Sequence, residues 1–339
     1  MSAHDAIDRR IVLRSRPRGM PVPGDFELVE RAVPPLLPGQ VRVRNDWLGL
    51  APAARLRMGA EATYTAPMAL GDPIHGQVVG TVVASAHDGV REGEPVMVVH
   101  AGWQTLTVCD GASVHRIDPT LAPPSAWLGA LGASGQTAWI GLEEIGGLRA
   151  GETVVVSAAA GAVGALAGQI ARLRGAARVV GIAGGEDRCR LARDAYGYDA
   201  CVDRHAPDLA ARIAEACGGG ADVYFDNTGG AVRDAVWPSM RPFGRVVVCG
   251  LVSEYNTGFV AGPAWSAILS KRLTVRGFIM SDHAARRAAF VAEMGAWYRD
   301  GRVRLLEHVV DGLEQAPAAF IGMLRGENRG KTLVRLRAP

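Results

Sequence analysis

The sequence predicts an α/β protein with a doubly wound parallel sheet and a second, mainly antiparallel and partly barrel-like β domain. From about residue 150 onward, β-prone runs alternate with amphipathic helical stretches, and this alternation joins parallel strands through right-handed helical crossovers. The first 130 residues instead hold short β-prone runs separated by proline and glycine, which is typical of antiparallel strands. A length of 339 residues also favours two domains over one.

Six strands are expected in the β-rich part, before the alternation of strands and helices begins. They are residues 11–16, 26–31, 41–50, 77–85, 95–100 and 106–110. The last part of the chain returns to strand, helix and strand, so we expect it to rejoin the N-terminal domain. The predicted domains are therefore residues 1–130 with 305–339, and residues 131–304.

The alternating part supplies six strand and helix pairs. The strands are expected at 153–158, 178–183, 200–203, 221–227, 245–250 and 273–280. The helices are expected at 164–175, 186–197, 208–218, 231–240, 264–272 and 283–301.

Composition excludes several classes of protein. The formal charge of +3 is small and no run of five like charges occurs, which disfavours nucleic acid and membrane surfaces as partners. The N-terminus is charged from its fifth residue and no stretch of 18 apolar residues follows, so we expect no signal peptide or membrane span. The five cysteines form no C-x-x-C pair, which favours a reducing cytoplasm and small buried thiols.

A small-residue bend follows the strand at 153–158. The spacing A-x-G-x-x-G falls on Ala159, Gly161 and Gly164, and such a pattern between a strand and a helix indicates a Rossmann dinucleotide site. Gly161 would let backbone N–H groups approach a pyrophosphate, and Gly164 would let the helix pack on the strand. Ala162 and Val163 would lie along the same phosphates. The alternative is a plain tight turn.

The end of the next strand predicts which nucleotide binds. It carries Gly184 and Gly185 and no acid at its tip, whereas NAD needs an Asp or Glu there for the ribose hydroxyl. Arg188 can contact a 2′-phosphate through two N–H groups, and Arg204 could add a second charge. NADPH or NADP is therefore favoured. The alternative is that Glu186 or Asp187 holds a ribose hydroxyl, although first-turn acids also complement a helix dipole.

Neither a metal nor a serine nucleophile is predicted. Cys109 is the one cysteine of the β-rich part, and His75, in "GDPIHGQVVG", has no cysteine before it, so the ligands of a zinc site are missing from the pattern. The stretch "GASGQ" places Gln136 where a nucleophile elbow needs glycine. The chemistry is therefore expected to come from the bound cofactor.

Several longer motifs carry a resemblance. "IDRRIVLRSRPRGMPVPGDFELVE", "AAAGAVGALAGQIARLRG", "VVGIAGGEDRC", "YFDNTGG", "FGRVVVCGLVSEYN" and "GMLRGENRGKTLVRL" are similar to the zinc-independent medium-chain dehydrogenase/reductases, in the branch of prostaglandin (leukotriene) reductases, plant alkenal double-bond reductases and bacterial curcumin reductases. The resemblance covers roughly residues 8–337. It implies a GroES-like substrate domain, a Rossmann domain, a homodimer, and hydride transfer from NADPH to the β-carbon of an α,β-unsaturated ketone or aldehyde.

The resemblance also implies where the cofactor lies. Arg188 takes the place of the family's 2′-phosphate lysine, Asn227 contacts the ribose and nicotinamide region, and Asn328 returns from the C-terminal segment. Two loops pass the nicotinamide. They consist of Cys249, Gly250, Leu251, Val252, Ser253 and Tyr255, and of Phe278, Ile279 and Met280.

Hydride addition to an enone leaves negative charge on the carbonyl oxygen, so the site needs a hydrogen-bond donor and a proton for the α-carbon. Tyr255 is the first candidate and Tyr64, in "TYTAPMALGD", the second; the alternative is that either phenol only lines the pocket. Trp103 and Gln136 are expected in the pocket wall or in packing.

The stretch "APAAR" departs from the family's D-P-Y-M-R run, since Ala51 and Ala53 replace an acid and a tyrosine while Pro52 and Arg55 remain. This predicts a wider pocket. A quinone reductase, a zinc-free alcohol dehydrogenase and a non-catalytic NADPH sensor stay open as alternatives.

Overall fold

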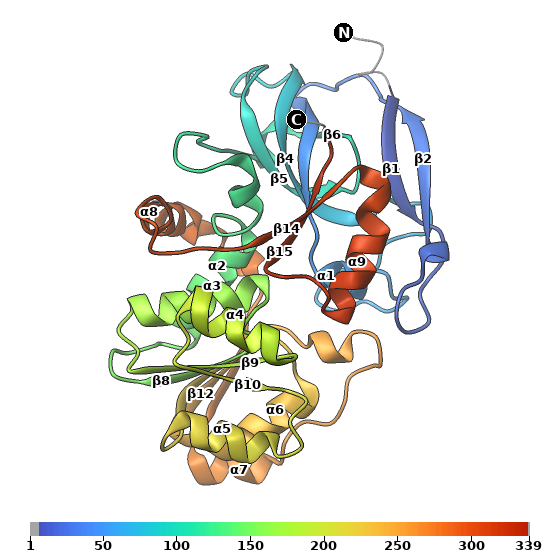
Figure 1. Cartoon of the computed structure of the whole chain (residues 1–339). Coiled ribbons are helices and arrows are strands. Elements are labelled where there is room, and N and C mark those ends of the chain that lie inside the picture. The colour runs from blue at the N-terminus through green and yellow to red at the C-terminus, as the bar shows by residue number, and fades with distance from the viewer. Residues whose placement is uncertain (1–6, 338–339) are drawn as a thin grey trace. The chain divides into compact units, whose positions relative to one another are not determined.

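The computed structural model describes residues 7–337, which divide into two compact units. Unit 1 contains the described residues up to Leu128 and those from Glu307 onward, and unit 2 spans Gly129–Leu306. Residues 1–6 and 338–339 of the predicted domain ranges lie outside the described residues. The α/β class is confirmed, because unit 2 holds a parallel sheet and unit 1 a separate, mainly antiparallel one (Figure 1).

Unit 1 is built on a seven-stranded sheet and a two-stranded sheet. The seven strands follow the order β14-β15-β3-β4-β5-β7, with β6 paired to β3, and β1 pairs with β2. Their bounds are β1 Ile7–Leu13, β2 Phe26–Ala32, β3 Gln40–Gly49, β4 His75–Ser85, β5 Pro95–Gly102, β6 Leu106–Asp110, β7 Val114–Arg116, β14 Glu307–Asp311 and β15 Lys331–Arg335. The C-terminal segment joins this sheet because β15 pairs with β3, Leu333 opposite Gly49.

The core of unit 1 centres on three aromatic rings. Trp103 is fully buried and stacks on Phe26 with ring centroids 5.9 Å apart. Phe320, from helix α9 (Ala316–Arg325), meets the same indole edge-on at 5.3 Å. Such offset and edge-to-face pairs are the favoured aromatic geometries, so the C-terminal helix is held onto a core made by N-terminal strands.

Three features of unit 1 differ from the sequence expectation, and one of them is the short strand β7, which was not expected. The first strand ends at Leu13, and the Arg16 side chain beyond it donates to the carbonyl oxygens of Met58 at 3.2 Å and Met68 at 2.9 Å. A short helix, α1 (Ala53–Arg57), occupies the "APAAR" stretch. Five residues carry too little periodicity to be recognised as a helix.

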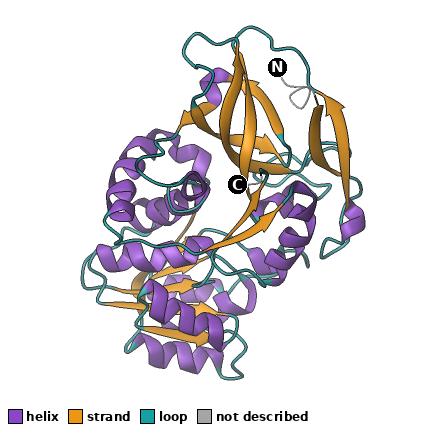
Figure 2. Ribbon diagram, turned by 45° about the horizontal axis from the view of Figure 1, so that its top comes forward, coloured by secondary structure: helices purple, strands orange, loops and turns teal. Residues whose placement is uncertain are grey.

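Unit 2 contains a six-stranded parallel sheet in the order β10-β9-β8-β11-β12-β13, the 3-2-1-4-5-6 order of a Rossmann fold. The strands are β8 Thr153–Ser157, β9 Arg178–Ala183, β10 Ala200–Asp203, β11 Ala221–Asp226, β12 Met240–Val248 and β13 Thr274–Gly277. The helices are α2 Ala133–Ile140, α3 Ala162–Leu173, α4 Glu186–Tyr196, α5 Leu209–Cys217, α6 Gly230–Val236, α7 Trp265–Lys271 and α8 Arg287–Arg299. Figure 2 shows helices on both faces of these strands, and β8 is buried throughout, as central parallel strands are.

Helix α2 was not expected from the sequence. Six of its eight residues are buried, so it lacks the polar face by which an amphipathic helix is recognised. It runs on into a π-helical turn, Gly141–Ile145. Gly141 permits this close approach, since a Cβ there would lie 2.4 Å from the ring of Phe225.

Candidate cofactor and active site

The predicted cofactor residues of unit 2 lie together at one edge of the parallel sheet. They follow the carboxyl ends of β8, β9, β10, β11, β12 and β13, and ligands of open α/β sheets bind at that edge. The order of the strands reverses between β8 and β11. The structure thus brings one continuous set of loops to the position where a dinucleotide would cross the sheet.

The close backbone packing in the bend between β8 and α3 explains why the residues there are small. Ala158 has a φ of 51°, and a Cβ on Gly164 would lie only 2.2 Å from the carbonyl oxygen of Ala158. Helix α3 is held this close by Tyr198, whose hydroxyl donates to the Gly164 carbonyl at 2.6 Å. The approach at Gly161 is less close, since a Cβ there would lie 3.2 Å from the Ala158 carbonyl oxygen and 3.9 Å from the Ala158 Cβ.

The N-terminus of α3 suits an anion. Gly161 is the N-cap, no side chain of the described residues caps this end, and its first turn holds no acid. Free N–H groups and the partial positive charge of the helix dipole therefore remain for a phosphate.

Two guanidinium groups meet at the end of β9. A Cβ on Gly184 would lie 3.0 Å from Arg204 Nε and 3.5 Å from Arg188 Nη1. Gly185 has a φ of 90°, and its N–H donates to Asp203 Oδ1 at 2.8 Å. The N–H groups of His205 and Gly185 lower the pKa of this carboxyl. The corner is thus a small-residue turn flanked by two positive side chains.

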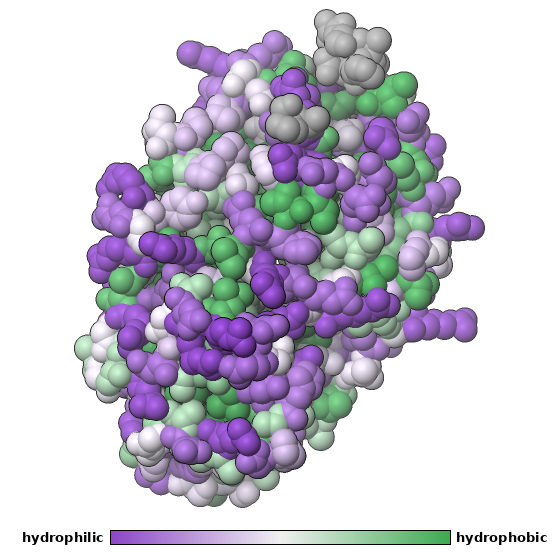
Figure 3. All heavy atoms as spheres, in the orientation of Figure 1, coloured by the Kyte–Doolittle hydropathy of each residue, from purple (hydrophilic) through white to green (hydrophobic). Residues whose placement is uncertain are grey.

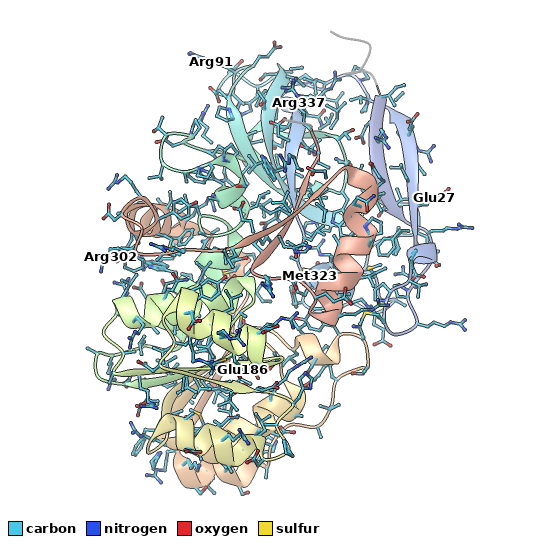
Figure 4. The ribbon with its side chains drawn as sticks, viewed as in Figure 1. Glu27, Arg91, Glu186, Arg302, Met323 and Arg337 are labelled. Carbon is cyan, nitrogen blue, oxygen red and sulfur yellow. The ribbon has the colours of Figure 1, made fainter. Side chains whose placement is uncertain are left out.

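The two acids of the first turn of α4 have partners along the helix. Glu186 (Figure 4) pairs with Arg193 at 2.6 Å, and Asp187 lies 3.5 Å from Arg190. In Figure 3 hydrophilic atoms gather over α4. These contacts favour the interpretation of both acids as helix-stabilising groups rather than as ribose ligands.

Asn227 follows β11 and is hydrogen-bonded to the end of β8, the two strands between which the strand order reverses. Its backbone N–H donates to Ser157 Oγ and its Nδ2 to the Ser157 carbonyl oxygen, both at 2.8 Å. The side chain is 7% exposed. Asn227 therefore fixes the edge of the sheet beside the predicted nicotinamide region.

Asp226 is a supporting residue that the sequence analysis missed. It is 1% exposed, and its Oδ1 accepts from Tyr224 Oη and from the N–H groups of Thr228 and Gly229, each at 2.9 Å. Its carbonyl oxygen accepts from Cys249 N at 2.9 Å. The "FDN" motif could have indicated it, because a carboxylate preceding a glycine pair at a strand end often accepts turn N–H groups.

The loop from Cys249 to Tyr255 returns over this edge. Glu254, also missed, is 3% exposed and accepts from Gly230 N at 2.8 Å, which fixes the turn. A Cβ on Gly250 would lie 3.4 Å from both Tyr255 Oη and the Asn227 carbonyl oxygen, so the phenol lies over the sheet edge. Burial and Asp226 raise the pKa of Cys249 to about 12.

The remaining predicted residues fall into two groups. The first group belongs to unit 2. Phe278 packs near the π-helical turn, 3.2 Å from where a Gly141 Cβ would stand, and after it Ile279 is exposed and Met280 half-buried. Gln136 is buried in α2. Tyr64, Trp103 and Asn328 belong to unit 1. Tyr64 is 55% exposed and Trp103 fully buried, and Asn328 Nδ2 donates to the Gly330 carbonyl oxygen at 2.9 Å.

Comparison with known proteins decides the family. Residues 9–117 match the family model of the N-terminal domain of oxidoreductase, and residues 162–297 match that of zinc-binding dehydrogenase. The chain is 43% identical to the NADPH-dependent curcumin reductase of Escherichia coli (strain K12) over 336 residues, 97% of either protein. The chain belongs to the medium-chain dehydrogenase/reductase family, in the branch without zinc.

Two further relatives agree with this membership. This dehydrogenase/reductase is 37% identical to prostaglandin reductase 1 of Mus musculus. The alignment covers 95% of the chain and 97% of the relative. Its fold matches the crystal structure of CurA in complex with NADPH from Vibrio vulnificus with a TM-score of 0.91 and 40% identity, covering 98% and 100% of the two chains. The resemblance inferred from the sequence is confirmed.

Within residues 7–337 of the dehydrogenase/reductase, no group of three His, Cys, Asp or Glu side chains could hold a metal ion, and no helix is long and apolar enough to cross a membrane. His75 lies beside His100, with ring centroids 5.6 Å apart. Burial, Arg57 and His100 lower the pKa of His75 to about 4. His75 is therefore held neutral in the folded protein.

This depressed pKa predicts acid sensitivity. An unfolded His75 binds a proton near pH 6.5 and the folded one only near pH 4, so the free energy of unfolding falls as pH decreases between these values. We expect His75→Gln to make the decrease in the free energy of unfolding less steep, as measured by urea unfolding between pH 6.5 and 5. The exposed His308 provides a control, since His308→Gln should keep the wild-type slope, and an unchanged slope in His75→Gln would contradict the assignment.

In the "APAAR" stretch of this dehydrogenase/reductase, which differs from the family's usual run, the arginine holds the segment in place. Arg55 is 7% exposed, and its Nη2 donates to the Gly19 carbonyl oxygen at 2.9 Å. Burial lowers its pKa. Arg55 therefore anchors α1 to the loop after β1, while Ala51 and Ala53 add no polar group to that part of unit 1.

Proposed function

We propose that this protein is an ene reductase that transfers hydride from NADPH to the β-carbon of α,β-unsaturated ketones or aldehydes. Its cofactor is NADPH, and it is an oxidoreductase of a branch that reduces C=C bonds. The observation that carries the proposal is similarity over nearly the whole chain to reductases named for curcumin and prostaglandin. Curcumin contains C=C bonds conjugated to carbonyl groups, which are the acceptors proposed here.

The two units have separate proposed roles. Unit 2 is the NADP-binding domain, in which the amides of Gly161–Gly164 hold the pyrophosphate and Arg188 and Arg204 hold the 2′-phosphate. Unit 1 is the substrate domain, to which Tyr64 contributes. When bound, NADPH supplies the hydride. We place the protein in the cytoplasm, because its five cysteines, all among the described residues, are free thiols.

Tyr255 is proposed to stabilise the product of hydride addition. Its phenol lies beside Gly250 and the Asn227 carbonyl, at the edge where the nicotinamide is expected. There the O–H can donate to the enolate oxygen as negative charge develops on it. The α-carbon then takes its proton from this phenol or from water.

Tyr255→Phe is expected to lower kcat about 100-fold, the usual effect of removing one oxyanion donor. Binding of NADPH, measured by nucleotide fluorescence, should stay unchanged, because the ring is retained. Tyr64→Phe is the comparison and should have the smaller effect on kcat. Wild-type turnover in Tyr255→Phe would assign the donor elsewhere.

The product distinguishes the proposed reaction from its alternatives. A series of enones and enals is incubated with NADPH and the products are analysed by mass spectrometry and NMR. We expect a gain of two hydrogens across C=C with the carbonyl retained. Formation of an allylic alcohol, faster turnover of benzoquinones, or NADPH binding without oxidation would each contradict the proposal.

We also propose a homodimer formed through unit 2. All four residues of β13, the last strand in the sheet's order, are exposed, and such an edge offers unpaired N–H and C=O groups. On the neighbouring helix α7, Trp265 is 83% and Leu269 80% exposed. Large apolar side chains gathered at a sheet edge indicate an interface.

Light scattering tests this interface. The wild type should have the mass of two chains, and the double substitution Trp265→Glu and Leu269→Glu should give one chain with an unchanged circular dichroism spectrum. Leu37 is 63% exposed in unit 1, so Leu37→Glu is the matched control and should remain dimeric. A monomeric wild type would refute the proposal.

A further inference from the structure

A buried carboxylate directly precedes Tyr255 in the loop that returns over the sheet edge. Glu254 is 3% exposed. Its Oε1 accepts from Gly230 N at 2.8 Å, and its Oε2 accepts from Val260 N at 3.2 Å, six residues further along the loop. One side chain therefore binds both the start of α6 and the second half of the loop that carries Tyr255.

Arg233, one turn into α6, bridges this carboxylate and the same loop. Its Nη1 lies 3.4 Å from Glu254 Oε1, and its Nη2 donates to the Ala261 carbonyl oxygen at 2.8 Å. The Arg233 side chain is 12% exposed. Burial opposes its charge, but the carboxylates of Asp234, Glu254 and Asp226 raise its pKa. Arg233 thus compensates the buried charge of Glu254, which would otherwise be costly.

The start of α6 is shaped around the carboxylate. Gly229 and Gly230 have φ values of 68° and 55°, in the left-handed region that favours glycine. A Cβ on Gly229 would lie only 2.6 Å from Glu254 Oε1, so a larger residue there would push the carboxylate away. The two glycines therefore give Glu254 a defined place against the helix.

Tyr255 takes its position from this anchored residue. Glu254 N donates to the Leu251 carbonyl oxygen at 2.8 Å, so the backbone before the phenol is held as well as the carboxylate. The Tyr255 Oη lies 3.4 Å from the position of a Cβ on Gly250, over the sheet edge. A group that stabilises a transition state has to be held within about 0.5 Å of its working position. Because Tyr255 is the next residue, a shift of the Glu254 backbone would also shift the phenol.

We propose that Glu254 and Arg233 are positioning residues, which act through Tyr255 by holding its phenol where negative charge develops on the substrate carbonyl oxygen. The proposal rests on the proposed function, in which Tyr255 donates to the enolate. The polar atoms of the Glu254–Arg233 pair are engaged with each other and with backbone groups, which leaves the donation itself to the phenol. Breaking the pair should therefore lower kcat and leave binding of NADPH intact.

Two variants reach the pair from either side. Glu254→Gln keeps the shape of the side chain, but an amide offers one accepting oxygen where the carboxylate offers two. Arg233→Met keeps most of the stem and removes the guanidinium. Asp234→Asn is the matched control, because Asp234 is 52% exposed and contacts only the outer side of the pair, with its Oδ1 2.9 Å from Arg233 Nε.

The experiment is a double-mutant cycle on the full-length enzyme, with NADPH and an enone. Glu254→Gln should lower kcat about tenfold, since a small misplacement of a catalytic group has effects of this order, and the KM for NADPH should stay constant. In the Tyr255→Phe enzyme the same substitution should have no further effect on kcat, because no phenolic proton remains to be positioned. Arg233→Met should follow the same pattern, and Asp234→Asn should match the wild type.

Hydrogen–deuterium exchange tests the anchoring without any reaction. In the enzyme free of nucleotide, the Val260 N–H is protected by the Glu254 carboxylate. Loss of one accepting oxygen in Glu254→Gln should speed exchange in the peptides that contain Gly230 or Val260. Asp234→Asn should leave their exchange unchanged. This measurement depends on neither the cofactor nor the substrate.

Three outcomes would overturn the proposal. They are an equal fall in kcat in the wild-type and Tyr255→Phe backgrounds, a raised KM for NADPH with kcat unchanged, and unchanged exchange in both variants of the pair. Poor folding of one variant leaves the other to complete the cycle. Wild-type kcat in Tyr255→Phe alone would instead refute the role of the phenol in the proposed function, and the exchange measurement would still decide whether the pair holds the loop.

Discussion

Gly164→Ala is expected to destabilise unit 2 by about 3 kcal/mol, the upper part of the usual range for overpacking. The added Cβ would lie 2.2 Å from the oxygen and 2.8 Å from the carbon of the Ala158 carbonyl, and 3.0 Å from Ala159 Cα. All three are backbone atoms of a strand end and bend, so no side chain can rotate away. Urea unfolding of the enzyme without nucleotide measures the loss.

Gly161→Ala provides the matched control three residues earlier. Its Cβ would come no closer than 3.2 Å to the Ala158 carbonyl oxygen and 3.9 Å to any other atom, and the φ of −80° suits alanine. The loss of stability should therefore be much smaller than for Gly164→Ala, while the KM for NADPH rises because the methyl group enters the space expected for the pyrophosphate. Equal stability of the two variants would show that the bend can relax around Gly164.

The elements that the sequence predicted well are those whose pattern reflects burial. The central strands β8 and β9 of unit 2 are nearly continuous apolar runs that are buried along their length, and α3, α4 and α5 carry one apolar face each. Helix α2 was missed because it is buried on nearly every side. Its place in the fold depends on Gly141 and Phe225, which are distant in sequence.

In the candidate site, too, some features could be predicted from the local sequence and others could not. Its backbone features, the glycine bend and the Gly184 corner, follow from local spacing and could be predicted. Glu254 was not, because it accepts from Gly230 N in another segment. Asp226 was missed although its N–H donors, Thr228 and Gly229, are local. Trp103, expected in the pocket wall or in packing, is fully buried between Phe26 and Phe320. Its position results from the C-terminal helix joining the N-terminal strands, which no local pattern reveals.

Arg188→Ala is expected to raise the KM for NADPH about 10- to 100-fold and to leave the KM for NADH unchanged. A charge-assisted hydrogen bond contributes about 1.5–3 kcal/mol, and this contact requires the phosphate that NADH lacks. Arg204 Nε also lies close to Gly184, 3.0 Å from the position of a Cβ there, so Arg204→Ala should act in the same direction. The double variant should use both nucleotides with similar KM values in steady-state assays.

Two neighbouring substitutions separate this effect from a general change in α4. Arg193 pairs with Glu186 at 2.6 Å, on the same helix but one turn and more from Gly184, so Arg193→Ala should keep the preference for NADPH. Glu186→Gln tests the alternative in which the acid holds a ribose hydroxyl, and it should leave both KM values unchanged. If Arg188→Ala raised the KM for NADPH and NADH equally, the arginine would serve the fold of α4, and the corner at Gly184 would not distinguish the two nucleotides.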